Sequence, residues 1–358
     1  MPLFLPHGRA CLIGSQPLDD HREATRLVLQ YTPDIPTWVQ LPTFKQEGMI
    51  AQFAPGLPGL RLVQDRLLVD TSADGFDHEM LIFFEAYLEV MEQGDLGGES
   101  PFTLSSETAM GFFTLLDELG AGPTRPAALK GQITGPITFC TGLQDQFGRA
   151  IFYHEALRDA AVKLIALKAA WQADRLKKTG LPVIIFLDEP ALAGYGSSEL
   201  ISISKDDIAG CFEEVIGSIH DHGALAGVHV CANTDWSLLL DSKVDIINFD
   251  AQGYFDRFIL YADGIRRFMQ GGGILAWGLV PTLRPEDIIN ATLEGLWRDW
   301  RNKSAQLCEL GGIDGAALRA QSLITPSCGT GALTRELSLR VLELTQALSQ
   351  RVVRDPTG

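Results

Sequence analysis

Short, almost continuous apolar runs alternate with amphipathic stretches along most of the chain. Runs such as Pro182–Pro190 (PVIIFLDEP) have too few polar positions for a strand with one solvent-facing side, so they indicate parallel strands buried on both faces. The stretches between them, for example Ala150–Thr179, have the spacing of amphipathic helices. Further apolar runs lie at Ala10–Ser15, Ala127–Gly135, Leu225–Val230, Val244–Asp250, Gly272–Pro281 and Ser322–Gly329.

With one ambiguous strand near Gln40, these segments make about eight strand–helix units. Such an alternation predicts an α/β protein with the architecture of a (β/α)₈ TIM barrel, as a single domain over residues 1–358. The other predicted helices are His21–Tyr31, Gly75–Glu92, Ser106–Leu119, Ser204–His220, Arg257–Met269, Pro285–Leu310 and Leu333–Arg351.

One part of the chain departs from this alternation, an irregular arm or loop at about 33–70. Its first section, Pro33–Gly59, is rich in proline and glycine, which favour loops over regular elements. Its second, Arg61–Asp70, has the alternating pattern of a hairpin or edge strand. The proline-rich section could cover a site, make a contact between copies in a homo-oligomer, or be an ordered surface excursion.

Composition and charge narrow the class of protein. The net charge of −16 argues against nucleic acid and anionic membranes as partners, because both require basic surfaces. The chain contains no run of apolar residues long enough for a transmembrane helix and no secretory pattern at its start, so we expect a cytoplasmic protein. Six cysteines in 358 residues do not make a disulfide scaffold. Three of them, Cys11, Cys140 and Cys211, are expected to pack as small hydrophobic residues.

Residues with ligand chemistry gather where the predicted strands end, which is where barrels of this kind carry their active sites. His229 and Cys231 stand two apart on one strand and therefore share a face. Cys328 lies at the end of the last predicted strand, where the chain enters a turn that contains glycine. Three His or Cys ligands with one open position are typical of catalytic zinc. Asp250 could be a fourth ligand, could orient His229 from outside the metal, or could be the N-cap of a helix after the strand.

The same reasoning assigns chemistry to the carboxylates Asp188 and Glu189, which end another strand. They could bind a cationic group of a substrate or take part in catalysis. Two sulfur ligands make zinc a poor activator of water but a good partner for a further thiol, which it deprotonates. We therefore expect alkyl transfer to a thiol, with Asp188 holding the ammonium of an amino-acid thiol.

Several motifs occur in one order that resembles the catalytic domain of cobalamin-independent methionine synthase. That family lies in a wider group with uroporphyrinogen decarboxylase and the methylcorrinoid:thiol methyltransferases. The match spans nearly the whole chain and is strongest from Gly131 onward. The motifs are IGS at Ile13–Ser15, GPIT at Gly135–Thr138, LDEPAL at Leu187–Leu192, HVC at His229–Cys231, the VDIINFD strand and PSCG at Pro326–Gly329.

The resemblance implies a (β/α)₈ barrel that methylates homocysteine to methionine. It implies zinc ligands at His229, Cys231 and Cys328, with Asp250 in place of a glutamate ligand. Homocysteine-binding positions would fall on Ile13, Gly14 and Ser15 and on Asp188. His229, Cys231, Cys328 and Asp188 are thus the residues predicted to carry catalysis, and Glu189 is added to the predicted substrate-binding set.

Departures from the family concern the methyl donor. The chain has no room for the family's additional N-terminal barrel, and Phe139 and Cys140 follow GPIT where the family has a folate-facing tryptophan. The family's Asp-Ile-His-Ser-Pro, whose histidine helps to protonate folate, is replaced by Gly278–Thr282 (GLVPT). Cobalt(I) of a corrinoid leaves without a proton, so we expect a methylcorrinoid donor, delivered by a separate carrier protein.

Three alternatives remain at this point. The first is methyl transfer from methyl-folate to homocysteine. The second is a metal-free decarboxylase of the porphyrin type, which would need arginines that are scarce near the strand ends. The third is a non-catalytic protein that binds zinc or a thiol metabolite.

Overall fold

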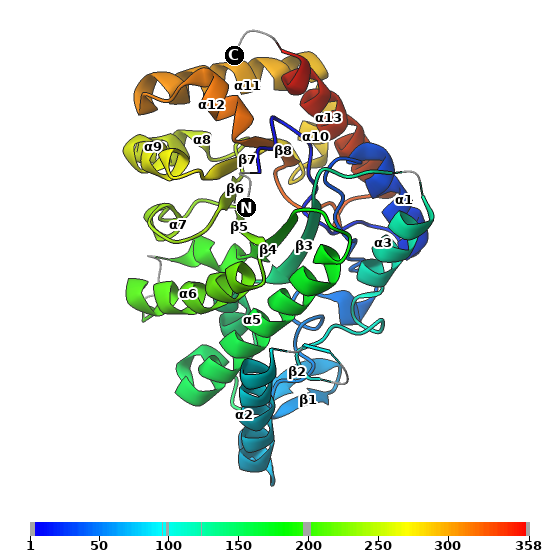
Figure 1. The fold of residues 1–358 in the computed structure, drawn as a ribbon, viewed down its shortest axis with the longest axis vertical. Coiled ribbons are helices and arrows are strands. Elements are labelled where there is room, and N and C mark those ends of the chain that lie inside the picture. The colour runs from blue at the N-terminus through cyan, green and yellow to red at the C-terminus, as the bar shows by residue number, and fades with distance from the viewer. Residues whose placement is uncertain (1–3, 95, 98–99, 123, 196–201, 356–358) are drawn as a thin grey trace.

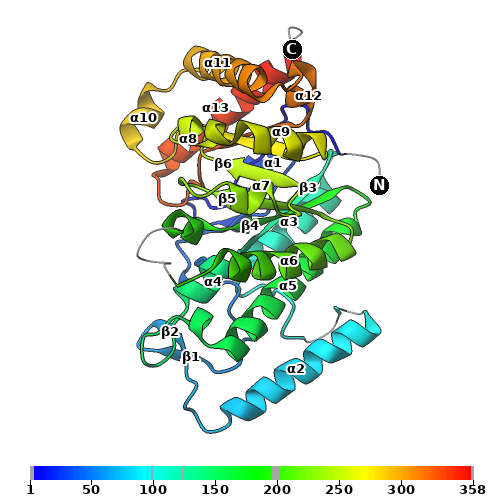
Figure 2. The same ribbon diagram turned by 90° about the vertical axis from the view of Figure 1, so that its left-hand side faces the viewer.

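The computed structural model describes residues 4–94, 96–97, 100–122, 124–195 and 202–355. Its centre is a curled six-stranded sheet in the order β3-β4-β5-β6-β7-β8, and every neighbouring pair is parallel. Helices cover the outer side of this sheet (Figures 1 and 2). The strands are β3 Leu129–Thr134, β4 Val183–Asp188, β5 Leu225–Val230, β6 Ile246–Phe249, β7 Ile274–Val280 and β8 Ser322–Pro326.

Side-chain caps determine where several helices begin. Ser204 and Asp207 form a capping box before α6, and Thr334 accepts a hydrogen bond from the backbone N–H of Leu337 before α13. The helices are α1 His21–Tyr31, α2 Phe76–Gln93, α3 Met110–Ala121, α4 Pro136–Gly142, α5 Glu155–Lys177, α6 Lys205–Asp221, α7 Ser237–Leu240, α8 Phe255–Phe258, α9 Ala262–Gln270, α10 Pro285–Asn290, α11 Leu293–Gly311, α12 Gly315–Ala320 and α13 Arg335–Arg354.

Two predicted helices differ from the observed ones because of caps inside the predicted spans. The helix expected from Ala150 starts at Glu155, since His154 caps it and residues Ile151–Tyr153 form a short 3₁₀ turn. The helix expected over Pro285–Leu310 is divided into α10 and α11. Thr292 interrupts it by accepting a hydrogen bond from the backbone N–H of Gly295, at 3.2 Å.

The predicted parallel α/β sheet is confirmed, whereas a complete eight-stranded barrel is not. The two segments expected to supply the first strands make only isolated parallel bridges, Ala10 to Ile324, Ser15 to Gln40 and Thr37 to Lys130. Both segments are extended and reach the two edge strands, β8 and β3. Proline lacks an amide N–H and glycine at positive φ departs from strand geometry. The prolines around these segments and Gly14, at φ 145°, therefore limit regular pairing.

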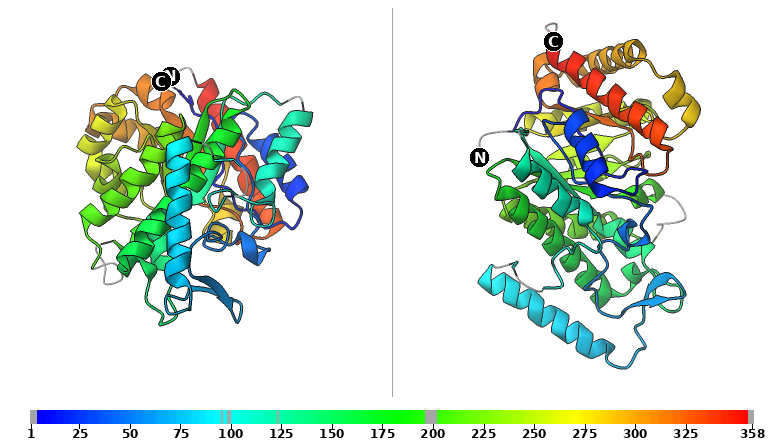
Figure 3. Two further views of the ribbon diagram at one scale, coloured as in Figure 1. Left: turned by 60° about the horizontal axis from the view of Figure 1, so that its bottom comes forward. Right: turned by 90° about the vertical axis from the view of Figure 1, so that its right-hand side faces the viewer.

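The expected irregular arm ends in a two-stranded hairpin, β1 Leu60–Val63 and β2 Arg66–Val69. Its turn residues Gln64 and Asp65 both have positive φ, 48° and 63°, as a type I′ turn requires. The proline-rich section packs on α5, where the Lys168 ammonium donates to the carbonyls of Phe53 (3.0 Å) and Pro55 (2.6 Å). Figure 3 shows the hairpin and α2 together at one end of the molecule.

The sheet's concave interior has an apolar end and a polar end. Ile184, Ile246 and Ile274 belong to a buried cluster that is separate from the residues packed under the helices. Toward the carboxyl ends, Asp188 of β4 pairs in register with His229 of β5, and His229 with Asn248 of β6. Polar side chains from three neighbouring strands therefore lie in one row. Among the described residues, no helix is both long and apolar enough to cross a membrane.

Candidate metal centre

Three potential metal ligands from two distant parts of the chain meet at the carboxyl end of the sheet. The ligand atoms of His229, Cys231 and Cys328 all lie within 4.8 Å of one another. Side-chain alternation sends His229 and Cys231 to the same face at the end of β5. Cys328 arrives from the loop directly after β8. His229 is buried, whereas Cys231 and Cys328 are half-buried.

The two thiols together lose one proton easily, but they resist the loss of a second. A hydrogen bond with the Cys328 thiol, together with the neighbouring His229 imidazole, holds the pKa of Cys231 well below its ordinary value, against the effect of burial. The hydrogen bond with Cys231 and burial raise the pKa of Cys328. A second thiolate would require a cation between the sulfur atoms, because like charges this close oppose each other. The pair is therefore suited to a divalent metal.

Asn248 on β6 orients the imidazole, and the sequence did not single it out. The Nδ1 of His229 is hydrogen-bonded to Oδ1 of Asn248, and both side chains are buried. The remaining ring nitrogen, Nε2, is buried and has no hydrogen-bond partner among the described residues. The signal in the sequence was that Asn248 is a polar residue inside the apolar run of β6. Only the register between β5 and β6 shows which group it serves.

The cluster fits zinc by its donor set and by this unpartnered nitrogen. Zinc takes imidazole nitrogen and thiolate sulfur in tetrahedral sites, and a buried polar atom without a partner is costly unless a ligand uses it. Three donors would leave the fourth position for a substrate. His229, Cys231 and Cys328 are thus the residues that could hold the ion.

Asp188 lies at the end of β4 beside this cluster. One of its carboxylate oxygens, Oδ1, is buried and has no partner among the described residues. Burial raises the pKa of the Asp188 carboxyl, while His229 and Lys130 act in the opposite direction. A buried acceptor of this kind could bind the ammonium of a ligand, and that ion pair would compensate for the hydration that the carboxylate has lost.

Glu189, predicted to contact substrate, is instead engaged by the start of α4. Its carboxylate accepts hydrogen bonds from the backbone N–H of Ile137 (2.9 Å) and from the N–H and hydroxyl of Thr138 (2.8 and 2.6 Å). Burial raises the pKa of Glu189 to about 7. Gly135 leaves room for this contact, since a Cβ there would collide with the glutamate. The segment after Gly135 is the helix α4, with this carboxylate at its N-terminus.

Asp250, expected as a fourth ligand or as a cap, is observed capping the turn after β6. Its Oδ1 accepts hydrogen bonds from the backbone N–H groups of Gln252 (2.9 Å) and Gly253 (2.8 Å). Burial raises the pKa of the Asp250 carboxyl, and these two hydrogen bonds lower it. The carboxylate is not part of the cluster within 4.8 Å, which consists of the histidine and the two cysteines.

The Ile13–Ser15 segment lies against the loop that carries Cys328. The Ser15 carbonyl accepts from the backbone N–H of Thr330 at 2.9 Å, and the Ser15 hydroxyl accepts from that of Gly331 at 3.3 Å. On the other side, the buried Lys130 ammonium donates to the Ile13 carbonyl at 2.6 Å. The structure therefore brings this predicted substrate-binding segment against the loop of Cys328.

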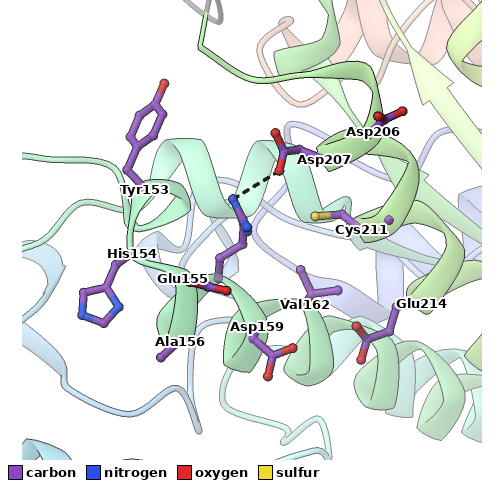
Figure 4. Close-up of a pocket in the computed structure, with 12 residues that line it drawn as sticks. Tyr153, His154, Glu155, Ala156, Asp159, Val162, Asp206, Asp207, Cys211 and Glu214 are labelled. Carbon is purple, nitrogen blue, oxygen red and sulfur yellow. Dashed lines mark ion pairs between the residues drawn. The ribbon is translucent and has the colours of Figure 1, made fainter.

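A groove of about 910 Å³ lies elsewhere, between α5 and α6 on the outer side of the sheet. Figure 4 shows its lining, in which Arg158 pairs with Asp207 at 3.6 Å. Lys163 of α5 pairs with Asp159 and Glu214, so acidic groups of the lining are already matched by cations. None of the site residues predicted from the sequence lines this groove.

No family model matches the chain, and no curated protein matches it. Among solved structures, a methyltransferase from Methanosarcina mazei superposes with a TM-score of 0.51 at 11% identity, over 96% of this chain and 96% of that chain. A B12-independent methionine synthase from Shewanella sp. W3-18-1, in complex with selenomethionine, gives a TM-score of 0.49 at 15% identity, over 98% of this chain and 94% of that chain. The first likeness shows a shared fold and leaves the family of this chain undecided.

Proposed function

We propose that the protein is a zinc-dependent methyltransferase with a thiol acceptor, homocysteine, which it converts to methionine. The observation that carries the proposal is the meeting of His229, Cys231 and Cys328 at the carboxyl end of the parallel sheet. The Methanosarcina mazei protein of similar fold is also named a methyltransferase. Fold alone does not decide an activity, so the donor set of the site bears the weight of the argument.

The donor set favours thiol chemistry over hydrolysis. His229 through Nε2 and the two thiolates would hold zinc, and the open position would receive the sulfur of the substrate. When bound, zinc lowers the pKa of that thiol so that it is present as a nucleophilic thiolate at neutral pH. Two thiolate ligands already neutralise the divalent charge, which makes activation of water less favourable than in a site of three histidines.

The other residues of the site would bind and orient the amino acid. Asp188 has a buried carboxylate oxygen without a partner among the described residues, and the homocysteine ammonium would pair with it. Ile13–Ser15 lies beside the Cys328 loop and would contact the rest of the amino-acid backbone. We leave Glu189 out of this set, because both of its oxygens are bound to the start of α4. Asp250 is left out of the metal ligands for the corresponding reason.

In the proposed reaction, a sulfur–carbon bond forms as the bond between the methyl carbon and its donor breaks. The electron pair of the broken bond stays with the donor, and the thiol has already lost its proton. A methylcorrinoid suits this balance, since its cobalt leaves as cobalt(I) without a proton. Gly278–Thr282, which spans the end of β7 and the two residues after it, contains neither an acid nor a histidine that could protonate a folate amine. A separate carrier protein would present the corrinoid at the carboxyl end of the sheet.

A methyl-transfer assay with two donors tests the proposal. Purified protein, with its zinc content measured, is incubated with homocysteine and either methylcobalamin or 5-methyltetrahydrofolate, and methionine is quantified. We expect one zinc per chain and methionine from methylcobalamin. Cys328→Ser should lose both, whereas Cys308→Ser, a half-buried cysteine on α11, should keep both.

The outcomes separate the alternatives. Methionine from the folate donor alone would replace the corrinoid in the proposal and keep the zinc. Homocysteine binding without turnover from either donor would favour a non-catalytic thiol-binding protein. A chain without stoichiometric zinc that is indifferent to Cys328→Ser would contradict the proposed centre itself.

A further inference from the structure

Asn248 occupies the middle of a hydrogen-bond network that crosses four strands of the sheet. Its Oδ1 faces Nδ1 of His229 on β5. Its Nδ2 donates to the Ala276 carbonyl on β7 at 2.8 Å and to the Thr325 hydroxyl on β8 at 2.9 Å. Asn248, Ala276 and Thr325 are each 0% exposed, so water does not compete for these bonds. A buried amide with every hydrogen-bonding atom engaged has one allowed orientation.

The Ala276 carbonyl decides that orientation. A carbonyl oxygen only accepts hydrogen bonds, so the Asn248 atom facing it must be the NH₂ group. Flipping the amide would place its oxygen against the Ala276 oxygen and leave a buried carbonyl unpaired, which costs the desolvation of that group. The amide oxygen is therefore held toward His229, and Nδ1 of the ring must be the donor.

A neutral imidazole carries one proton, so a proton on Nδ1 leaves the lone pair on Nε2. Nε2 is the buried nitrogen that has no partner among the described residues, and because Asn248 engages Nδ1, Nε2 is the ring nitrogen left for the cluster with the two thiols. A proton on Nε2 would remove the lone pair that a metal needs. The Asn248 amide thus selects which nitrogen is available for coordination before any ion arrives.

The network also links His229 to the strand that delivers a second ligand. Thr325 precedes Cys328 by three residues, and its hydroxyl accepts from the same amide group whose oxygen holds the imidazole. A shift of the end of β8 would therefore move the His229 ring through the Asn248 side chain alone. Ring orientation and the approach of the Cys328 thiol are coupled by this arrangement.

We infer that Asn248 is a positioning residue that holds His229 in the Nδ1–H tautomer and so makes Nε2 the ligand atom of the metal centre. The inference rests on the proposed zinc site, and it concerns how the protein sets the tautomer of one ligand before zinc binds. Outer partners of this kind contribute about 10- to 100-fold to metal affinity.

Two substitutions separate this role from simple filling of the interior. Asn248→Leu keeps a similar volume and removes the acceptor, whereas Asn248→Asp keeps an acceptor facing Nδ1 and loses only the amide donor to the Ala276 carbonyl. The matched control is Gln321→Leu, because the Gln321 amide is also buried and donates to two carbonyls, those of Met269 and Gly273. That control removes a comparable network away from the thiols.

The first readout is the tautomer of His229 in metal-free protein. Long-range ¹H–¹⁵N spectra of protein labelled with ¹⁵N-histidine are recorded at alkaline pH, where the imidazole is neutral, and His229→Ala identifies the signal. We expect the Nδ1–H form in the wild type, in Asn248→Asp and in Gln321→Leu, and its loss in Asn248→Leu. An Nε2–H ring in the wild type would overturn the inference without any variant, even if Asn248→Leu did not fold.

The second readout is the zinc dissociation constant, measured by competition with a chromogenic chelator. Asn248→Leu should weaken binding about 10- to 100-fold, while Asn248→Asp and Gln321→Leu stay within about threefold of the wild type. Unchanged affinity in a folded Asn248→Leu protein would contradict the inference and leave the proposed function standing. A wild-type chain that binds no zinc would sink the proposed centre, and the tautomer spectrum would then decide on Asn248 alone.

Discussion

The two ends of the sheet's interior use the same strands in opposite ways. On β4, Ile184 packs in the apolar cluster, and Asp188, four residues later, has a carboxylate oxygen that no described residue partners. On β6, Ile246 belongs to that cluster and Asn248 follows two residues later in the polar row. These positions share a face because side chains alternate along a strand. The amino end therefore contributes apolar packing, and the carboxyl end carries the polar groups of the candidate metal centre.

The difference follows from what each end must satisfy. Apolar side chains at the amino end stabilise the fold by leaving water. The buried oxygen of Asp188 and the buried Nε2 of His229 have no partner among the described residues, and such groups cost stability until a ligand engages them. We expect substitutions at the two ends to affect different properties, ligand binding at one and unfolding free energy at the other.

The largest effect is expected from removing a thiol at the polar end. Cys231→Ser should weaken zinc binding by more than about 100-fold, since loss of an outer partner alone costs about 10- to 100-fold. Thermal unfolding of the metal-free protein should change little, because Cys231 is only half-buried. Chelator competition and calorimetry measure the two quantities. A variant that keeps its zinc affinity would show that Cys231 is not a ligand.

At the apolar end, Ile246→Ala should reverse this pattern. The residue is fully buried, and truncations of this type cost about 2–5 kcal/mol of unfolding free energy. Zinc stoichiometry in the folded protein should remain that of the wild type. Denaturant unfolding with metal analysis checks both, and loss of zinc from a folded Ile246→Ala protein would show that the two ends are not separable.

A smaller effect is expected for Asp188→Asn, which removes charge from the polar end without removing a metal ligand. A hydrogen bond to a charged group contributes about 1.5–3 kcal/mol, so the KM for homocysteine should rise about 10- to 100-fold with zinc content unchanged. Asp250→Asn is the matched control, because that carboxylate caps a turn. If the control loses zinc instead, Asp250 is a ligand after all.

The smallest effect concerns a buried charge outside both ends. Burial lowers the pKa of Lys168 to about 7, and its ammonium binds the Phe53 and Pro55 carbonyls. Between this value and the ordinary lysine pKa, the unfolded chain holds the proton more tightly than the folded one. The slope of unfolding free energy against pH between about 8 and 10 should therefore be more positive in the wild type than in Lys168→Met, by about 1.4 kcal/mol per unit.

Lys163 on the same helix provides the matched comparison. Its ammonium pairs with Asp159 and Glu214, and these hydrogen bonds raise the pKa of Lys163 despite its burial. Lys163→Met should keep the slope between pH 8 and 10. Equal slopes in the wild type and in Lys168→Met, from denaturant unfolding across this range, would show that Lys168 is charged in the folded protein.

How far the sequence predicted this molecule depends on whether a feature is local to one strand. The strands β3 to β8 follow from their apolar runs, and the alternation of side chains along one strand is enough to place His229 and Cys231 together. The apolar run of one strand does not reveal how that strand is aligned with its neighbour. The hydrogen bond between Asn248 and His229 therefore could not be anticipated. The role of Glu189 was missed in the same way, and the sequence left the role of Asp250 open between a metal ligand and a cap. Each carboxylate is held by backbone N–H groups whose positions depend on the turn or helix beside it.

X-ray absorption at the zinc edge tests the central claim most directly, because it counts the sulfur atoms around the metal. Zinc-loaded protein should show two sulfur neighbours at about 2.3 Å together with nitrogen or oxygen neighbours, as expected for Cys231, Cys328 and His229. Addition of homocysteine should raise the sulfur count to three. A zinc shell without sulfur, or a shell that homocysteine leaves unchanged, would contradict the proposal that this centre binds and activates a thiol.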